Sequence, residues 1–217
     1  MDDNSAYLIL LGGELSTTDR LQQQITGRRV IAADSGMRHA RMLGVEPDIW
    51  VGDFDSATAD LKQDWRHVER IPFPAEKNLT DGEIAVEEAL TRGARNLVLA
   101  GSLAGERSDH ALLHMTYACS LAQSGLEVHL TSGEEEAWPL LAGSRSFELP
   151  ASSLFSIVNF TPVQGLHIEG ARYPLTNHEL AFGSSRTLSN VAEGCVTITM
   201  GSGSAILVAR PYDLSGR

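Results

Sequence analysis

Two patterns of apolar residues divide the chain near residue 132. In the first part, short apolar runs alternate with longer segments in which apolar residues recur at helical spacing. This alternation predicts βαβ units and a mostly parallel sheet with helices on both faces, which is a doubly wound α/β fold. The predicted strands are 7–11, 30–33, 49–51, 68–71, 97–100 and 128–130, and the predicted helices are 19–25, 36–43, 58–65, 81–91 and 109–124.

The second part contains short strand-like runs separated by Gly, Pro, Asn and Ser, with no helix of useful length. Residues 196–200 (Val-Thr-Ile-Thr-Met) alternate with period two, which is typical of a half-buried antiparallel strand. We therefore expect an α/β domain at 1–132 and a smaller all-β domain at 133–217. The predicted strands of the second domain are 137–141, 146–149, 155–160, 166–169, 196–200 and 205–209.

Charge excludes several classes of partner. The 217 residues include 28 acidic and 17 basic side chains, which gives a net charge of −11. Duplex nucleic acids and anionic membranes both require a basic surface, so we expect neither as a partner. The N-terminus begins with acidic residues and has an apolar run of only residues 6–11, too short for a signal peptide or a membrane span. We predict a cytoplasmic protein.

The two cysteines, Cys119 and Cys195, lie far apart and have no Cys-x-x-Cys spacing. A disulfide framework or a thiolate zinc site is not expected from this pattern. We predict that both cysteines are small buried apolar residues.

The most distinctive motif is Gly-Asp-Phe-Asp-Ser at residues 52–56, directly after a predicted strand. Asp53 and Asp55 are two residues apart and can point to one side of an extended loop. Such a pair suits Mg²⁺, which takes oxygen ligands and often shares them with substrate phosphates. A turn that caps the next helix explains the same residues equally well.

A second acidic segment covers residues 76–83. Thr80 and Glu83 have the spacing of a capping box at the start of a helix, and Asp81 in the first turn suits the helix dipole. These structural roles explain most of the segment. They do not explain Lys77, which lies close to the start of the predicted helix, and helix starts are positions at which anions bind.

Two further loops follow predicted strands. Residues 101–110 combine a Gly-bearing turn with Arg107, which can bind phosphate oxygens, and with Asp109 and His110 at the start of a helix. His110 and His114 have metal-ligand spacing, but no Glu completes a His-Glu-x-x-His motif. Asp34 ends another strand. Because four acidic loops follow strands of one predicted sheet, we expect them to converge on one edge and form a Mg²⁺–nucleotide site.

Taken together and in this order, the motifs resemble those of the thiamine pyrophosphokinase family. The family shows Ala-Asp-Gly-Gly, Gly-Asp-Phe-Asp-Ser, Lys-x-x-Thr-Asp-x-Glu, Gly-x-x-Gly-x-Arg-x-Asp-His and a late Ser-Asn. The corresponding segments here are 33–36, 52–56, 77–83, 101–110 and 182–190, and the resemblance spans about residues 30–208.

The resemblance implies transfer of the pyrophosphoryl group of ATP to the hydroxyl of thiamine, giving thiamine diphosphate and AMP. It implies an α/β domain followed by a smaller all-β sandwich, and a homodimer with the site between the α/β domain of one subunit and the β domain of the other. Carried over residue by residue, it assigns Mg²⁺ to Asp53, Asp55 and Asp81, and adds Arg107 as a catalytic residue. The implied nucleotide site comprises Asp34, Gly36, Lys77, Thr80, Arg107, Asp109 and His110, and the implied thiamine site comprises Ser189 and Asn190.

Several positions depart from the family pattern, namely Ser35, Asn78, Glu106 and His114. We expect these departures to change substrate affinity or fine specificity rather than the class of reaction. Two alternatives stay open. One is a pyrophosphokinase for another alcohol, such as a hydroxymethylpterin, and the other is a non-catalytic protein that binds ATP or thiamine for regulation.

Overall fold

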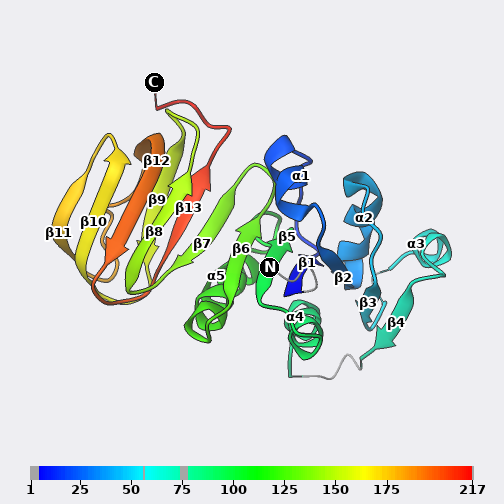
Figure 1. Ribbon diagram of the computed structural model, residues 1–217. Helices are drawn as coiled ribbons and strands as arrows, with labels where there is room; N and C mark the ends of the chain where they lie inside the picture. Colours follow the sequence, from blue (N-terminus) through cyan, green and yellow to red (C-terminus); the bar gives the residue numbers. More distant parts are fainter. Residues whose placement is uncertain (1–4, 56, 74–77, 217) are drawn as a thin grey trace. The chain divides into compact units, whose positions relative to one another are not determined.

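The structure is a computed structural model that describes residues 5–55, 57–73 and 78–216. The chain divides into two compact units (Figure 1). The first unit comprises the residues up to 111 together with 126–133, and the second comprises 112–125 together with the residues from 134 onward. Helix α5 (Ser108–Gln123) therefore begins in the first unit and ends in the second.

The first unit contains a parallel sheet with the strand order β6-β5-β1-β2-β3-β4. Its buried strands are apolar almost throughout, as expected of a sheet covered on both faces. Parallel pairing brings the carboxyl ends of all six strands to one edge. The strands are β1 (Ala6–Leu10), β2 (Arg29–Ala33), β3 (Ile49–Gly52), β4 (Glu69–Pro72), β5 (Asn96–Ala100) and β6 (Glu127–Thr131).

Helices cover both faces of this sheet (Figure 1). A buried cluster joins one face, through residues such as Leu10 and Trp50, to Leu21 of α1 and Leu43 of α2. Helix α4 packs against β1, β2 and β3 on the other face. The helices of this unit are α1 (Asp19–Ile25), a 3-10 helix (Asp34–Met37), α2 (Arg38–Leu43), α3 (Ala59–Asp64), α4 (Asp81–Thr91) and the start of α5.

The second unit is antiparallel, and its strands form two sheets. One sheet has the order β7-β13-β9 and continues into the start of β12, and the other has the order β8-β12-β10-β11. Side chains from both sheets form one buried core, which is the arrangement of a β-sandwich. The strands are β7 (Glu136–Leu140), β8 (Gly143–Glu148), β9 (Leu154–Asn159), β10 (Val163–Ala171), β11 (Leu175–Leu180), β12 (Asn190–Met200) and β13 (Ala205–Arg210).

Strand β12 belongs to both sheets of the sandwich. Asn190 and Val191 pair with β9, whereas the segment from Cys195 to Met200 pairs with β8. Beyond Gly194 the strand alternates as predicted, with Val196 among the residues facing the core.

The predicted fold, a parallel α/β region followed by an antiparallel β region, is confirmed. Strand β11 was not predicted. The expectation for Cys119 is correct, but Cys195 is exposed, so that prediction is wrong. The alternation that buries Val196 puts Cys195 on the outer face of the sheet, opposite Glu148. Within the described residues, no helix combines the length and apolar character needed to cross a membrane.

Candidate active site

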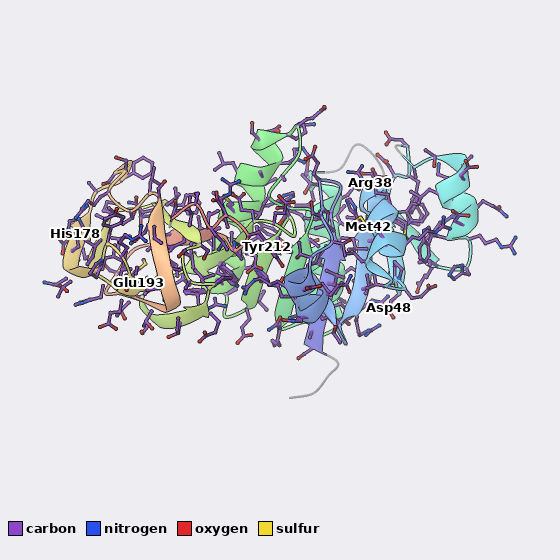
Figure 2. All side chains as sticks on the ribbon, turned by 90° about the horizontal axis from the view of Figure 1, so that it is seen from above. Arg38, Met42, Asp48, His178, Glu193 and Tyr212 are labelled. Carbon is purple, nitrogen blue, oxygen red and sulfur yellow. The ribbon has the colours of Figure 1, made fainter. Side chains whose placement is uncertain are left out.

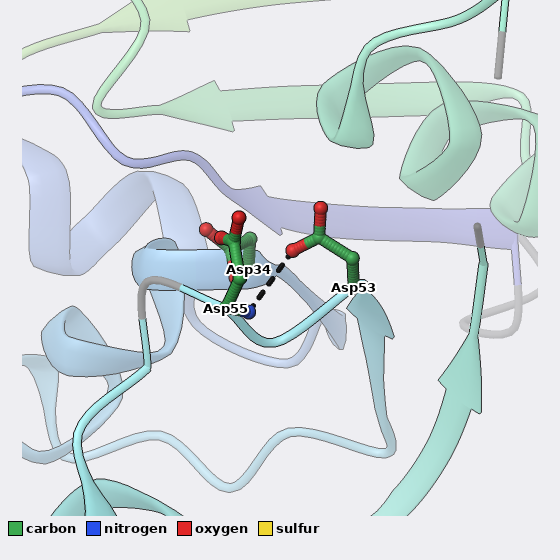
Figure 3. A group of neighbouring side chains, drawn as sticks. All are labelled: Asp34, Asp53 and Asp55. Carbon is green, nitrogen blue, oxygen red and sulfur yellow. Dashed lines mark hydrogen bonds between the residues drawn. The ribbon is translucent and has the colours of Figure 1, made fainter. Parts of the chain in front are cut away.

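Three aspartate side chains meet at the carboxyl ends of neighbouring strands in the first unit. Asp34 follows β2, whereas Asp53 and Asp55 follow β3, and β2 pairs with β3 up to Ala33 and Val51. One carboxylate oxygen from each aspartate lies within 4.8 Å of the other two (Figure 3). Such an oxygen donor set is the kind that Mg²⁺ takes.

This group differs in one member from the predicted metal ligands. Asp34 was predicted to shape the nucleotide pocket, and the structure places it with Asp53 and Asp55. Asp81 is the first residue of α4 and is not part of the group. Within the described ranges, no other set of three or more His, Cys, Asp or Glu side chains is close enough to hold a metal ion, and this includes His110 and His114.

The backbone at the acidic group adopts conformations that are uncommon for residues with side chains. Asp34 has a φ of 41° and Phe54, between the other two aspartates, has a φ of 61°. Left-handed conformations of this kind cost about 1–2 kcal/mol per residue. The backbone N–H of Asp55 donates to Oδ1 of Asp53 at 3.0 Å, which stabilises the second turn. Strained residues of this kind cluster at functional sites.

Gly52 lets the two acidic turns approach each other. A Cβ added at this position would lie 3.1 Å from Cβ and 3.2 Å from Cα of Asp34, and the φ of Gly52 is +148°. Both the contact and the backbone conformation therefore favour glycine. The absence of a side chain at the end of β3 is what allows the carboxylates of Asp34 and Asp53 to share one site.

The start of α4 has the predicted capping box. Thr80 Oγ1 accepts a hydrogen bond from the N–H of Glu83 at 3.2 Å, and the N–H of Thr80 donates to Oε2 of Glu83 at 2.8 Å. These bonds fix the first turn, in which Asp81 is partly buried. Lys77 lies outside the described residues, so its contact with phosphate stays a prediction.

Arg107 and Asp109 form a two-pronged ion pair just before and within the first turn of α5. Nε and Nη2 of Arg107 donate to the two carboxylate oxygens of Asp109 at 2.9 and 2.7 Å. These hydrogen bonds hold the pKa of Asp109 well below its usual range. Both side chains are about two-thirds exposed, at 66 and 65%. The guanidinium is thus oriented by the carboxylate and accessible to an anion.

A glycine pair missed by the sequence reasoning follows β1 at the same edge of the sheet. Arg38 is the first residue of α2 (Figure 2). Its Nη2 donates to the carbonyl oxygens of Gly12 and Gly13 at 2.5 and 3.2 Å, and Nε2 of His39 lies 2.9 Å from the Gly13 oxygen. The N–H of Gly13 also donates to the oxygen of Gly101 at 3.1 Å. Two glycines directly after a buried strand were the available signal for this loop.

His39 is nearly buried beneath this loop. Removal from water lowers the pKa of its imidazole, although the hydrogen bond to Gly13 opposes the shift. The neutral ring is therefore the form that the fold favours.

In the second unit, the predicted thiamine residues Ser189 and Asn190 have different environments. Ser189 is exposed, has a φ of 55°, and donates its N–H to Ser156 Oγ at 3.0 Å. Asn190 is buried, and its Oδ1 accepts from the N–H of Tyr173 at 3.1 Å and from that of Val191 at 2.8 Å. Its Nδ2 donates to the Tyr173 oxygen at 2.9 Å. Asn190 thus fixes the turn that presents Ser189.

Apolar side chains are exposed near this turn. Leu188 is 48% exposed and precedes Ser189, and Phe182, in the same loop, is 69% exposed. The loop is tied to β9 because the N–H of Ile157 donates to the Thr187 oxygen at 3.0 Å. An exposed polar turn with apolar neighbours can bind a ligand that has a polar edge and an aromatic face.

Two family models match the chain. The model described as thiamin pyrophosphokinase, catalytic domain, matches residues 23–130, and the one described as thiamin pyrophosphokinase, vitamin B1 binding domain, matches residues 146–204. Among curated proteins, the thiamine pyrophosphokinase of Bacillus subtilis (strain 168) is 25% identical over 169 residues, which cover 74% of this chain and 76% of that protein.

Solved structures share the fold over nearly the whole chain. The crystal structure of thiamine pyrophosphokinase from Bacillus subtilis has a TM-score of 0.84 at 22% identity, covering 95% of this chain and 99% of that one. A thiamin pyrophosphokinase family protein from Enterococcus faecalis has a TM-score of 0.80 at 25% identity, with coverages of 95 and 99%. The chain therefore belongs to the thiamin pyrophosphokinase family and is an enzyme of that family, with both its catalytic and its vitamin B1 binding domains.

Proposed function

We propose that this thiamine pyrophosphokinase uses the acidic group at the ends of β2 and β3 to bind the metal that accompanies ATP. The convergence of Asp34, Asp53 and Asp55 within the segment matched by the catalytic-domain model supports this proposal. Mg²⁺, when bound there, supplies positive charge that neutralises the phosphates. Asp81 stays a proposed ligand at the start of α4.

In the proposed reaction, the hydroxyl oxygen of thiamine forms a bond to the β-phosphorus of ATP. The bond between this phosphorus and the oxygen leading to the α-phosphorus breaks, and AMP leaves with the electron pair. The hydroxyl proton passes to a carboxylate, for which Asp55 and Asp81 are the candidates. Such transfers depend mainly on alignment and on charge stabilisation, so the protein acts chiefly by positioning.

The third loop is proposed to hold the phosphates. Arg107 presents two N–H groups in a plane that matches phosphate oxygens, and Asp109 orients them until the nucleotide arrives. Gly36, Thr80 and His110 are proposed to complete the nucleotide site, together with Lys77 from outside the described residues.

The turn at Ser189 is proposed to bind the aminopyrimidine of thiamine. Its exposure supports a direct contact, whereas the amide of Asn190 is engaged with the Tyr173 backbone and acts by holding the turn.

We assign the catalytic role to residues 1–132 and thiamine binding to residues 133–217. We also propose a homodimer with the site between subunits, and, because ATP is the donor, a cytoplasmic location.

The test is chromatographic analysis of the products formed from ATP, Mg²⁺ and thiamine by the full chain. We expect AMP and thiamine diphosphate in equal amounts, with no reaction when EDTA replaces Mg²⁺. ADP or inorganic phosphate as the product would contradict the proposed transfer. Replacing thiamine with a hydroxymethylpterin should abolish AMP release, and AMP release only with the pterin would reassign the acceptor.

A further inference from the structure

Trp50 lies beneath both acidic turns of the first unit. It is the second residue of β3 and is fully buried in the cluster that joins the sheet to α1 and α2. Its indole Nε1–H donates a hydrogen bond to the main-chain oxygen of Asp34 at 2.8 Å. The bond fixes the peptide group that follows Asp34, and with it the direction in which the Asp34 side chain leaves the backbone.

The same indole ring contacts the second acidic turn. The rings of Trp50 and Phe54 meet edge to face, with centroids 5.1 Å apart and an interplanar angle of 84°. Phe54 lies between Asp53 and Asp55, so its position fixes the loop that carries both carboxylates. From β4, the guanidinium of Arg70 lies 5.1 Å from the centroid of the Trp50 ring and holds the indole from a third side.

The two residues that Trp50 contacts in these turns are also the strained ones. In the described part of the first unit, Asp34 and Phe54 are the two residues other than glycine with a positive φ. Strained conformations persist when surrounding contacts determine them. One buried side chain supplies such a contact to each, and both turns supply carboxylates to the same group (Figure 3).

We propose that Trp50 is a positioning residue of the metal site, which sets the placement of Asp34 relative to Asp53 and Asp55. This inference rests on the proposed metal-binding role of those aspartates. Trp50 does not contact the metal. It acts through the Asp34 carbonyl and the Phe54 ring, as groups behind metal ligands commonly do.

The test is Trp50→Phe, which keeps an aromatic ring in β3 and removes the indole N–H. Binding of Mn²⁺, which takes the same oxygen ligands as Mg²⁺, is measured by electron paramagnetic resonance on the full chain. We expect the dissociation constant for Mn²⁺ to rise about 10-fold or more, the range seen when partners of metal ligands are lost. The Mg²⁺ concentration for half-maximal activity should rise in parallel, while the KM for thiamine should not change.

Trp65→Phe is the matched control. Trp65 is buried in the same cluster, so its replacement disturbs the same core, and its ring contacts that of His67, which lies outside both acidic turns. We expect Trp65→Phe to lower the melting temperature without changing Mn²⁺ affinity. Equal loss of Mn²⁺ affinity in both variants would overturn the inference, because general loosening of the core would then explain it.

Two further variants separate the possible failures. Loss of Mn²⁺ binding in Asp53→Asn, with tight binding by the unaltered protein, supports the metal site itself. If that holds and Trp50→Phe binds Mn²⁺ normally, the inference fails and the proposed function stands. If Trp50→Phe does not fold, Phe54→Leu at a partly exposed position removes the ring contact and should weaken Mn²⁺ binding, and unchanged affinity there would overturn the inference.

Discussion

The acidic group in the first unit and the Ser189 turn in the second are built in different ways. Asp34 and Asp53 meet because two adjacent parallel strands end at the same edge of a sheet. Ser189 precedes an antiparallel strand, and its place depends on hydrogen bonds of Ser156 and Asn190. In the first region the topology brings the functional groups together, whereas in the second a few local bonds do so.

This difference has a consequence for mutation. Where topology supplies the geometry, a functional side chain can be replaced with little loss of stability, because the strands hold the site. Where local bonds supply it, the residue that fixes the turn and the residue that contacts the ligand are distinct. In the first unit, replacing a functional side chain should therefore reduce activity with little loss of stability. In the second, replacing the residue that fixes the turn should reduce stability, and replacing the residue proposed to contact the ligand should reduce activity.

Asp53→Asn should have the largest effect. Thiamine-dependent AMP release should fall by about 100-fold or more, because a proposed metal ligand is lost. The melting temperature should stay the same or rise slightly, since three carboxylates within 4.8 Å repel one another without a cation. Asp60→Asn, an exposed acid in the first turn of α3, is the control and should keep full activity. Full activity in Asp53→Asn would show that topology alone does not identify the site.

Gly52→Ala tests the close approach of the two acidic turns. The added Cβ would lie 3.1 Å from Cβ of Asp34, so we expect AMP release to fall at least about 10-fold, with a loss of about 1–3 kcal/mol in the free energy of unfolding.

Gly44→Ala is the matched control for this substitution. Gly44 has a φ of +67°, and among the described residues no atom beyond its local backbone and chain neighbours lies within 4 Å of the added Cβ, so the variant should lose stability and retain activity. Denaturant unfolding and the AMP assay distinguish the two variants. Equal activity in both variants would show that the site does not depend on the close approach of the two acidic turns.

Asn190→Ala and Ser189→Ala should separate stability from binding in the second unit. Removing the Asn190 amide leaves backbone groups of Tyr173 without their bonds, so the free energy of unfolding should fall by about 1–3 kcal/mol. Ser189→Ala should leave it nearly unchanged and raise the KM for thiamine about 2- to 10-fold, the value of one hydrogen bond. The reverse pattern, with stability lost at Ser189, would contradict the division of roles proposed for this turn.

The pH dependence of stability should show the smallest effect, through His39. Burial lowers the pKa of its imidazole, so below about 6.5 the unfolded chain binds a proton that the folded chain does not. The free energy of unfolding should therefore decrease as the pH falls through that value. In His39→Gln the decrease should be smaller, as measured by urea unfolding at pH 7.5 and 5.5. An identical decrease in both proteins would assign it to other groups.

Much of the fold could be predicted because the spacing of apolar residues and the lengths of the apolar runs were clear in the sequence. The apolar runs of the first unit and the alternation at residues 196–200 each identify an element with one geometry. Strand β11 could not be found, because its sequence, Leu-Thr-Asn-His-Glu-Leu, has no regular alternation and contains Asn177 with a φ of 48°. The burial of Cys195 was predicted wrongly because it was inferred from the residue type. The alternation along the strand, which places Val196 in the core, implies that Cys195 faces outward.

The sequence predicted which loops carry the candidate site, but not which of their residues contact one another. Position after a strand made Asp34, Asp53 and Asp55 candidate site residues. Their grouping depends on β2 lying beside β3, and local sequence does not specify strand order. The amide of Asn190 bonds to Tyr173, 17 residues away, which no local pattern indicates. The proposed role of Trp50 could not be predicted either, because a tryptophan in an apolar run is expected to be an ordinary core residue.

Strand β12 couples the two sheets of the sandwich, since its start pairs with β9 and its end with β8. A strand shared in this way cannot leave one sheet while the other stays intact, so both sheets should open as one cooperative unit in native-state hydrogen exchange. Asn190 is its first residue, and the Ser189 turn is joined directly to it. The turn proposed to bind thiamine is thereby anchored to a strand that both sheets share rather than to a loop that opens independently.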